Sequence, residues 1–127
     1  MRTNVTNIIY PELSYKINGI FFKIHNDLGR FRNEKQYADA IEKIFKDEGV
    51  VYEREVALKP SFDGEMERRN ICDFVVENKI VVDVKAKRIV TKEDYFQIKR
   101  YLDSGKFKLG MIVNFRSKYL TPKRIAN

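Results

Sequence analysis

The stretch CDFVVENKIVVDVKAK, residues 72–87, places two aspartates and a lysine in segments otherwise dominated by valine and isoleucine. Asp73 lies in the first half of the stretch, and Asp83 and Lys85 lie in the second. A lone charge in such an apolar segment is costly unless it is paired or bound to a metal. Two carboxylates beside an ammonium group are therefore candidates for a divalent-cation site with an adjacent positive charge.

Side-chain alternation separates the polar and apolar residues of the second half, because successive side chains of a strand point to opposite faces. Asp83 and Lys85 share one face with Val81. The opposite face is apolar throughout and consists of Ile80, Val82, Val84 and Ala86. We expect the apolar face to pack on a helix layer, and the polar pair to point to a second surface near the C-terminal end of the strand.

The register of the predicted hairpin decides whether Asp73 joins this pair. A two-residue turn at 77–78 would place Asp73 opposite Val82, on the wrong face. A regular three-residue loop at 77–79 would place it opposite Asp83. Cooperation of the two acids requires the second register or a bulge of the same parity. Opposed carboxylates repel each other, and a bound Mg²⁺ or Mn²⁺ would remove that repulsion.

Residues from two predicted helices could complete the site. Glu34 lies three residues before Tyr37, on the inward stripe of its helix and in the first turn, where the helix dipole alone already favours an acid. Gln97 and Tyr101 are four residues apart, so they share one face of a later helix, which Asp94 borders. Each residue alone fits a bland interpretation, such as a boundary position or a surface ion pair. The order of the whole set, Glu, Asp, Asp-x-Lys and Gln-x-x-x-Tyr, is what favours a shared site.

The elements that must position these residues follow from apolar periodicity and from end signals such as Pro11, Gly29, Asn33, Thr91 and Gly105. The periodicity predicts helices over 11–27, 34–48 and 92–104, with Asn33 as N-cap, a capping box from Thr91 to Asp94, and Gly105 at the last helix end. Strands are predicted over 50–58, 69–76, 79–86 and 107–115, with a loop at 60–64 and a short strand or tail near 119–126. Residues 1–10 are predicted to be loose. The order indicates an α/β fold with a mixed sheet of about four to five strands flanked by α-helices.

Composition limits the class of protein. The 127 residues suit one domain, 1–127, and carry a net charge of +7 with a pI of about 9.5, which favours an anionic partner, nucleic acid first. The sequence has no apolar run long enough for a transmembrane helix and no signal peptide, so we expect a cytoplasmic protein without membrane contact. Cys72 is the only cysteine, which excludes an intrachain disulfide and a cysteine-rich zinc site.

The ordered set of residues resembles the PD-(D/E)XK nuclease superfamily and, more narrowly, the small bacterial proteins of the GxxExxY family. The resemblance runs from about residue 12 to 127 and rests on HNDLG, EKQY, CDFVVENKIVVDVKAK, QIKRYL and KLGMIVNF. Two positions depart from the family pattern. Cys72 stands where the superfamily name has proline, and Phe31 stands where the glycine of GxxExxY would align, so the loop GRFRNE is altered.

The resemblance implies a role for each matching residue. Glu34 and Tyr37 match the Glu-x-x-Tyr of the family name, Asp73 matches the first catalytic acid, and Asp83 with Lys85 matches the (D/E)-x-K pair. Gln97 and Tyr101 resemble the Gln-x-x-x-Tyr motif of the RecB-like branch. The implied catalytic set is therefore Glu34, Asp73, Asp83, Lys85, Gln97 and Tyr101, with Asp73, Asp83 and Glu34 as the metal ligands.

These assignments predict a nuclease that hydrolyses phosphodiester bonds with Mg²⁺ or Mn²⁺, and DNA is favoured over RNA. Basic residues beside the motifs would line the nucleic-acid groove, namely Lys87, Arg88, Lys99 and Arg100. Some RecB-like nucleases place a histidine from an early helix on the metal; His25, the only histidine, is instead interpreted as a helix-end residue that bonds a nearby carbonyl or carboxylate. The alternative functions are a non-catalytic nucleic-acid-binding or regulatory module and a protein-interaction domain with vestigial acids. The small size favours a homodimer or a larger nucleic-acid-processing partner.

Overall fold

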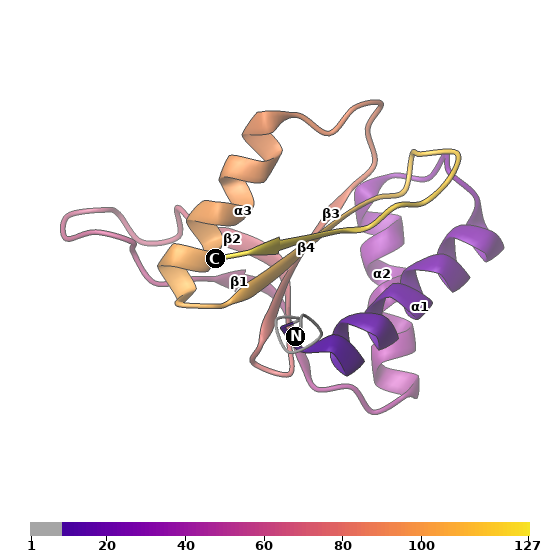
Figure 1. The fold of residues 1–127 in the computed structure, drawn as a ribbon, viewed down its shortest axis with the longest axis horizontal. Coiled ribbons are helices and arrows are strands. Elements are labelled where there is room, and N and C mark those ends of the chain that lie inside the picture. Colours follow the sequence, from indigo (N-terminus) through magenta and orange to yellow (C-terminus); the bar gives the residue numbers. More distant parts are fainter. Residues whose placement is uncertain (1–8) are drawn as a thin grey trace, which may run out of the picture.

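The structure is a computed structural model that describes residues 9–127, and within this range it contains a mixed five-stranded sheet and three α-helices (Figure 1). The element order is α1 (Pro11–Leu28), α2 (Glu34–Asp47), β1 (Tyr52–Ala57), β2 (Ile71–Val76), β3 (Ile80–Lys85), α3 (Lys92–Gly105), β4 (Leu109–Asn114) and β5 (Lys123–Ala126). The predicted α/β architecture is confirmed. Most of the predicted loose segment, residues 1–10, lies outside the described residues.

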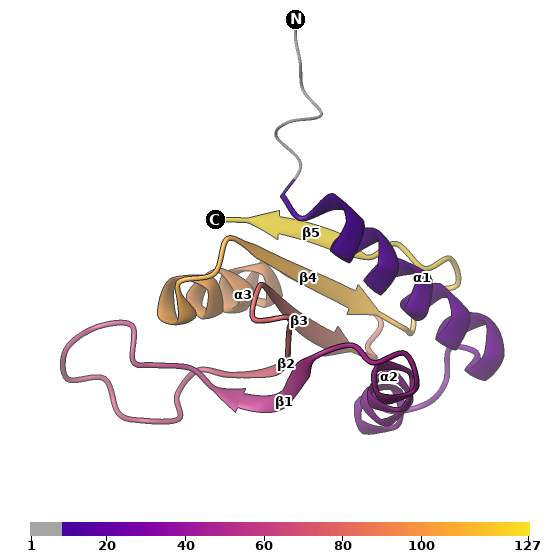
Figure 2. The same ribbon diagram turned by 90° about the horizontal axis from the view of Figure 1, so that it is seen from below.

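The sheet has the spatial order β1-β2-β3-β4-β5 (Figure 2). β3 and β4 are parallel, and the other neighbouring pairs are antiparallel. Helix α3 is the crossover that joins the two parallel strands, as parallel pairs require. The C-terminal ends of β3 and β4 therefore lie side by side, where the amide of Phe115 donates a 2.9 Å hydrogen bond to the carbonyl of Lys85.

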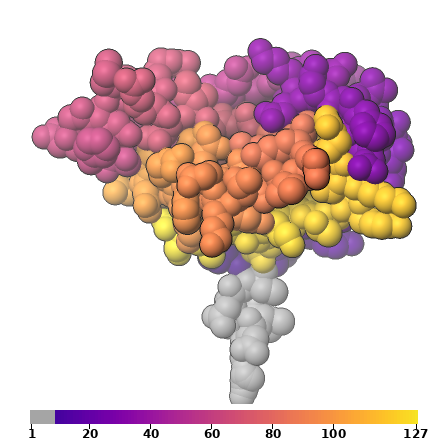
Figure 3. All heavy atoms as spheres, turned by 90° about the horizontal axis from the view of Figure 1, so that it is seen from above, coloured from indigo at the N-terminus to yellow at the C-terminus, as the bar shows by residue number. Residues whose placement is uncertain are grey.

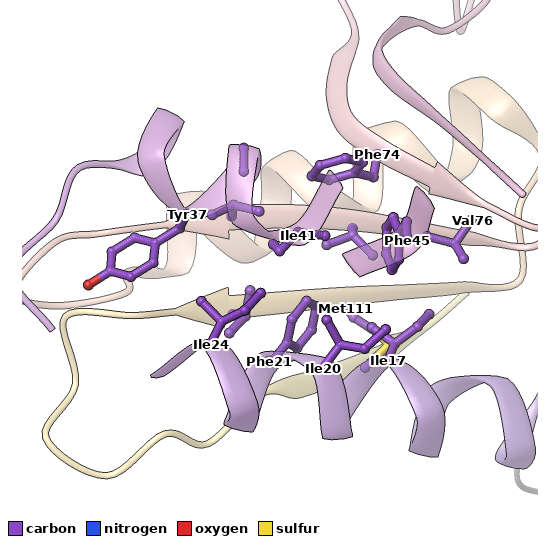
Figure 4. Packing of buried hydrophobic residues seen from close by; sticks show 14 of the residues in the cluster. Ile17, Ile20, Phe21, Ile24, Tyr37, Ile41, Phe45, Phe74, Val76 and Met111 are labelled. Carbon is purple, nitrogen blue, oxygen red and sulfur yellow. The ribbon is translucent and has the colours of Figure 1, made fainter. Parts of the chain in front are cut away.

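Helices α1 and α2 cover one face of the sheet and build the larger core (Figures 2 and 4). The apolar stripe of α1 buries Phe21 and that of α2 buries Phe45, and both rings are fully shielded from solvent. Phe45 meets Phe74 of β2 edge-on with 5.6 Å between ring centroids. The apolar side chains of β3 face this layer, as the alternation predicted, and include Ile80, Val82 and Val84.

Helix α3 covers the opposite face over a smaller core. Ile98 and Leu102 of α3 pack against Val81 of β3 and Ile112 of β4. Gly110 makes this close approach possible, because a Cβ atom at that position would lie only 2.8 Å from the Ile98 side chain. The face that carries Asp83 and Lys85 is thus partly apolar and partly polar, with a helix directly above it.

The β2–β3 turn has the register that lets the two aspartates share a face. Val76 pairs with Ile80 and Phe74 pairs with Val82, so the loop contains three residues, 77–79. Glu77 and Asn78 adopt left-handed backbone angles, with φ of 52° and 55°. The amide of residue 79 closes the turn on the carbonyl of Val76.

The three helices begin where predicted, and each ends one residue from its predicted end, at Leu28, Asp47 and Gly105. Asn33 caps α2, because its side chain accepts a 2.9 Å hydrogen bond from the Gln36 amide and the Gln36 side chain accepts one from the Asn33 amide. Gly105 was predicted to end α3, but the helix includes it and the left-handed cap is Lys106, with φ of 61°. Gly105 lets the Phe107 ring pack closely on the helix end, since a Cβ atom there would lie 2.4 Å from the ring.

The predicted loop at 60–64 is confirmed as part of the irregular segment between β1 and β2. The strand predicted over 107–115 is shorter, at 109–114, and the final strand covers only 123–126 of the predicted 119–126. None of the helices in the part of the chain that the structure describes is both long and apolar enough to cross a membrane.

Candidate active site

The candidate site lies where the β2–β3 ladder ends. The last backbone pair is Phe74 with Val82, and beyond it the side chain of Asp73 takes the place of a backbone partner. Its Oδ2 accepts a 2.6 Å hydrogen bond from the amide of Val84. The strand pair therefore opens at this point, with the Asp73 carboxylate held in the opening.

The backbone of β1 is also distorted beside Asp73. Arg54 pairs with Phe74 and Val56 pairs with Cys72, while Glu55 between them has a φ of 54°. A left-handed angle in a residue other than glycine costs on the order of 1 kcal/mol or more and often marks a functional segment. The distortion leaves the backbone around Asp73 outside regular pairing on both sides.

Asp83 is buried, with 4% of its surface exposed. Burial raises the pKa of Asp83 to about 7, and the hydrogen-bonding and charge of the neighbouring Asp73 carboxylate act in the same direction. The two aspartates are thus close neighbours, as the hairpin register requires. One oxygen of Asp83, Oδ2, lies 3.1 Å from Lys85 Nζ, within ion-pair distance, yet it is buried without a hydrogen bond of acceptable geometry within residues 9–127.

Lys85 is surrounded by acceptors on the α3 face. Its Nζ donates a 2.9 Å hydrogen bond to Gln97 Oε1 and lies 3.8 Å from Asp94 Oδ1. Burial lowers the pKa of Lys85, but the carboxylate charges, that of Asp83 foremost, outweigh burial and raise the pKa above its ordinary value. Lys85 is therefore an ammonium group at neutral pH, which donates hydrogen bonds and cannot accept a proton.

Tyr101 lies on α3 four residues after Gln97, near enough to Asp83 and Asp73 to be affected by their charges. It is 6% exposed, and burial raises the pKa of its phenol, followed by the charges of Asp83 and Asp73. Cys72 is 1% exposed, and burial together with the Asp73 charge raises the pKa of its thiol to about 12. The thiol is therefore unreactive, in agreement with the interpretation of Cys72 as a small buried residue.

Glu34 reaches the site from the first turn of α2. Its side chain lines a small cavity of about 130 Å³ together with Asp73, Glu55 and Val84. Glu34 is itself exposed, unlike the two aspartates. Within residues 9–127, no three histidine, cysteine, aspartate or glutamate side chains lie close enough together to ligate one ion. Glu34 therefore shares a cavity with Asp73 but not with Asp83, and its predicted role as a metal ligand stays a prediction.

Tyr37, three residues after Glu34, supports the loop that leads into α2. Its hydroxyl donates a 2.6 Å hydrogen bond to the carbonyl of Gly29 and accepts one from the amide of Arg32. The ring stacks on Phe115 at 4.3 Å between centroids. The spacing of Glu34 and Tyr37 therefore joins an acid at the cavity to a buried tyrosine that orders the preceding loop.

Asp94 is a site residue whose contacts the sequence did not reveal. It is 8% exposed, and its Oδ2 lies 2.6 Å from Lys87 Nζ while its Oδ1 faces Lys85. Burial raises the pKa of Asp94, but Lys87 and the Thr91 amide lower it to a net value below the ordinary range. The predicted capping contact with Thr91 is present. The spacing of three residues before Gln97 was the available clue, because it places both on one face of α3.

The four basic residues predicted to line a groove have different environments. The ammonium of Lys87 is engaged by Asp94, and Lys99 donates to the carbonyl of Ala126 in β5 rather than facing the acids. Arg88 borders a cavity of about 210 Å³ next to Asn114. Arg100 is exposed on α3.

His25 contacts the loop after β4, in agreement with its interpretation as a helix-end residue. Its Nε2 lies 2.8 Å from the carbonyl of Ser117, which assigns the ring proton to that nitrogen. The ring therefore ties the end of α1 to the β4–β5 loop and lies outside the acid cluster.

The arrangement of a split β2–β3 ladder, two acids and a lysine defines the class of protein. A family model described as the PD-(D/E)XK nuclease superfamily matches residues 11–125. The chain belongs to this superfamily, whose members are typically nucleases that use divalent metal ions. Searches of curated proteins and of solved structures give no significant match.

Proposed function

We propose that the protein is a nuclease that hydrolyses phosphodiester bonds of nucleic acid, DNA in preference to RNA, with Mg²⁺ or Mn²⁺ held by Asp73 and Asp83. The observation that carries this proposal is the buried Asp83 carboxylate, which lies next to a second acid, Asp73, and is faced, in the part of the chain described, by one ammonium group, Lys85 Nζ, at 3.1 Å. A divalent cation suits such a carboxylate, because it relieves both the desolvation and the repulsion. Glu34, exposed at the cavity, fits a contribution through water.

A bound divalent ion would polarise the phosphate and lower the pKa of the attacking water. The other roles in the reaction belong to side chains of the protein. The protonated Lys85, oriented by Gln97, donates to charge that grows on the phosphoryl oxygens. Asp94 is a positioning residue, because it lies 3.8 Å from Lys85 Nζ, where its charge adds to that of Asp83 in raising the pKa of Lys85, and because it pairs with Lys87.

Nucleic acid as the substrate is supported by the superfamily and by the net charge of +7. Lys87, Arg88 and Arg100 are proposed as phosphate contacts, and Lys99 would join them only by releasing the Ala126 carbonyl. We also propose membership of the GxxExxY family, supported by Glu34 and Tyr37, and a single nuclease-like domain over residues 1–127. A homodimer or a larger partner would increase the surface that contacts a duplex.

The test is cleavage of labelled single- and double-stranded DNA and RNA by the purified protein with Mg²⁺ or Mn²⁺. We expect cleavage that requires the metal and is lost in Asp83→Ala and Lys85→Ala. Asp63→Ala, in the distant β1–β2 loop, is the matched control and should retain activity. Titration calorimetry with Mn²⁺ should give binding that Asp83→Ala abolishes.

Absence of metal-dependent cleavage together with metal-independent nucleic-acid binding would overturn the enzymatic proposal. That result would support the alternative, a binding or regulatory module on a nuclease fold. If neither nucleic acid nor metal binds, the acids are vestigial.

A further inference from the structure

Hydrogen bonds join two loops near the C-terminal ends of β3 and β4 into one surface. Arg30 lies in the α1–α2 connector and Arg116 in the β4–β5 loop, and Figures 1 and 2 show these segments side by side. Each arginine donates from Nε to the backbone carbonyl of the other at 2.9 Å. The bond from His25 to Ser117 ties the last turn of α1 to the same β4–β5 loop. These reciprocal contacts connect the two loops directly.

Phe31 projects from this surface near both guanidinium groups. Its side chain is 77% exposed, and the guanidinium carbons of Arg30 and Arg116 lie 5.0 and 5.9 Å from the ring centroid. Other large apolar side chains are also exposed, such as Phe62 at 63%, but within residues 9–127 only Phe31 has two guanidinium groups within this distance. We call Arg30, Phe31 and Arg116 the arginine–phenylalanine platform.

Within the described part of the chain, the platform has free hydrogen-bond donors and an exposed ring, the groups that bind a nucleotide. The Nε contacts leave the terminal nitrogens of Arg30 and Arg116 without a hydrogen bond or ion pair among the described residues. Guanidinium groups with such donors bind phosphate, and an exposed ring offers a face on which a base stacks. Lys118 and Tyr119 follow in the same loop, where the ammonium lies 5.5 Å from the tyrosine centroid. They add a second basic and aromatic pair nearby.

The platform is physically linked to the candidate active site. The amide of Phe115, next to Arg116, bonds the carbonyl of Lys85, and Asn114 bonds both the amide and the carbonyl of Lys87. The connector on the other side leads directly into Glu34. Figure 3 shows one face on which the segment after β3, the β4–β5 loop and the α1–α2 region lie next to one another.

We propose that the arginine–phenylalanine platform binds an unpaired nucleotide next to the phosphate that is cleaved, with its base on Phe31 and its phosphate on Arg30 and Arg116. This inference rests on the proposed nuclease function and assigns single-stranded nucleic acid, or a single-stranded end, as the preferred substrate. A base within a duplex is stacked on its neighbours and cannot use the ring. A second copy of this chain is a poorer occupant, because two copies of a surface rich in arginine would repel each other.

The experiment measures binding of a 12-nucleotide single-stranded DNA and of the same sequence as a duplex, by fluorescence anisotropy with Ca²⁺ in the Lys85→Ala background to prevent cleavage. In that background, Phe31→Leu should weaken single-strand binding about tenfold and change duplex binding little. Phe31→Tyr, which restores a ring, should retain affinity. Phe62→Leu is the matched exposed control. Arg116→Ala should also weaken binding more than Arg69→Ala, which removes the same charge from the distant loop.

A direct report of stacking comes from 2-aminopurine placed at each position of the oligonucleotide in turn. We expect one position to show quenched fluorescence, lost in Phe31→Leu and kept in Phe31→Tyr. If wild-type protein cleaves DNA but Phe31→Leu and Phe62→Leu bind alike and no position is quenched, the platform proposal is overturned while the nuclease proposal stands. If wild-type protein neither binds nor cleaves any oligonucleotide, both proposals fail. Self-association lost in Phe31→Leu would assign the platform to a dimer contact and overturn nucleotide binding.

Discussion

The two faces of the sheet are built from the same strands but do different things. The face under α1 and α2 is closed by large apolar side chains, with Phe21, Phe45 and Phe74 fully buried. The face under α3 buries a smaller apolar cluster and admits Asp83, Lys85 and Asp94 beside it. Successive side chains of β3 point alternately to these two faces of the sheet. Stability is concentrated on one face, which allows the other to hold charges whose burial is unfavourable.

The largest effect is expected from truncating a buried side chain on the apolar face, under α1 and α2. Phe45→Ala should lower the free energy of unfolding by about 3–5 kcal/mol, because the ring is fully buried between α2 and the sheet. Tyr15→Ala on α1, at a position 81% exposed, is the control and should change it little. Urea denaturation followed by circular dichroism measures both. A loss below 1 kcal/mol for Phe45→Ala would mean that the α1 and α2 layer is not tightly packed.

The polar side is tested by Lys85→Ala. We expect cleavage to fall by about 10²–10³ because a preorganised cationic donor is removed, and the free energy of unfolding to fall as well, because the buried Asp83 carboxylate loses its ion-pair partner. Steady-state cleavage of a labelled oligonucleotide gives the effect, and Lys59→Ala in the β1–β2 loop serves as the matched charge control. Activity within twofold of wild type would remove Lys85 from the catalytic set.

The pH dependence of stability gives a sharper measure of the buried acid. Because Asp83 has a folded-state pKa raised to about 7, the native protein binds more protons than the unfolded chain between about pH 4 and 7. Stability of the metal-free protein should therefore fall as pH rises through this window. Above about pH 7 the stabilisation that comes from protonated Asp83 is lost.

Asp83→Asn removes this titration. Relative to wild type, the variant should gain about 2 kcal/mol of unfolding free energy between pH 5.5 and pH 8, while losing Mn²⁺ binding. Asp63→Asn, an exposed acid in the β1–β2 loop, is the control. Parallel stability curves for wild type and Asp83→Asn would contradict the raised pKa.

The smallest expected effect concerns Asp94. In Asp94→Asn, the pKa of Lys85 should fall because a carboxylate 3.8 Å away is neutralised, while the amide oxygen can still cap Thr91. The alkaline limb of the cleavage–pH profile should move down by about half a pH unit. Asp103→Asn, exposed on the same helix, should leave the profile unchanged. A fall in rate at constant profile would indicate a purely structural role.

Several features of the fold could be predicted because they depend on near neighbours in the chain. The helix stripes, the Asn33 cap and the alternation of β3 follow from local periodicity and are confirmed. The end of α3 was wrong by one residue, since Gly105 lets Phe107 pack closely rather than supplying the left-handed backbone angle. The local sequence of the segment did not indicate that contact.

The site was predictable in part. The sequence left two hairpin registers open for Asp73, and the three-residue loop decides between them. It could not show that Lys87 faces Asp94, that Lys99 faces Ala126, or that Glu34 stays exposed at the cavity. The altered loop around Phe31 had no predicted role, because its neighbour Arg116 lies 85 residues further along the chain.

The sequence by itself determined which residues share a face, because the periods of strands and helices are properties of the local backbone. It therefore established the pairing of Asp83 with Lys85 and of Gln97 with Tyr101. Only the tertiary structure decided which of these faces meet. The distances between ammonium groups, carboxylates and loop arginines depend on sheet register and helix placement, which are set by the sum of many packing contacts remote in sequence.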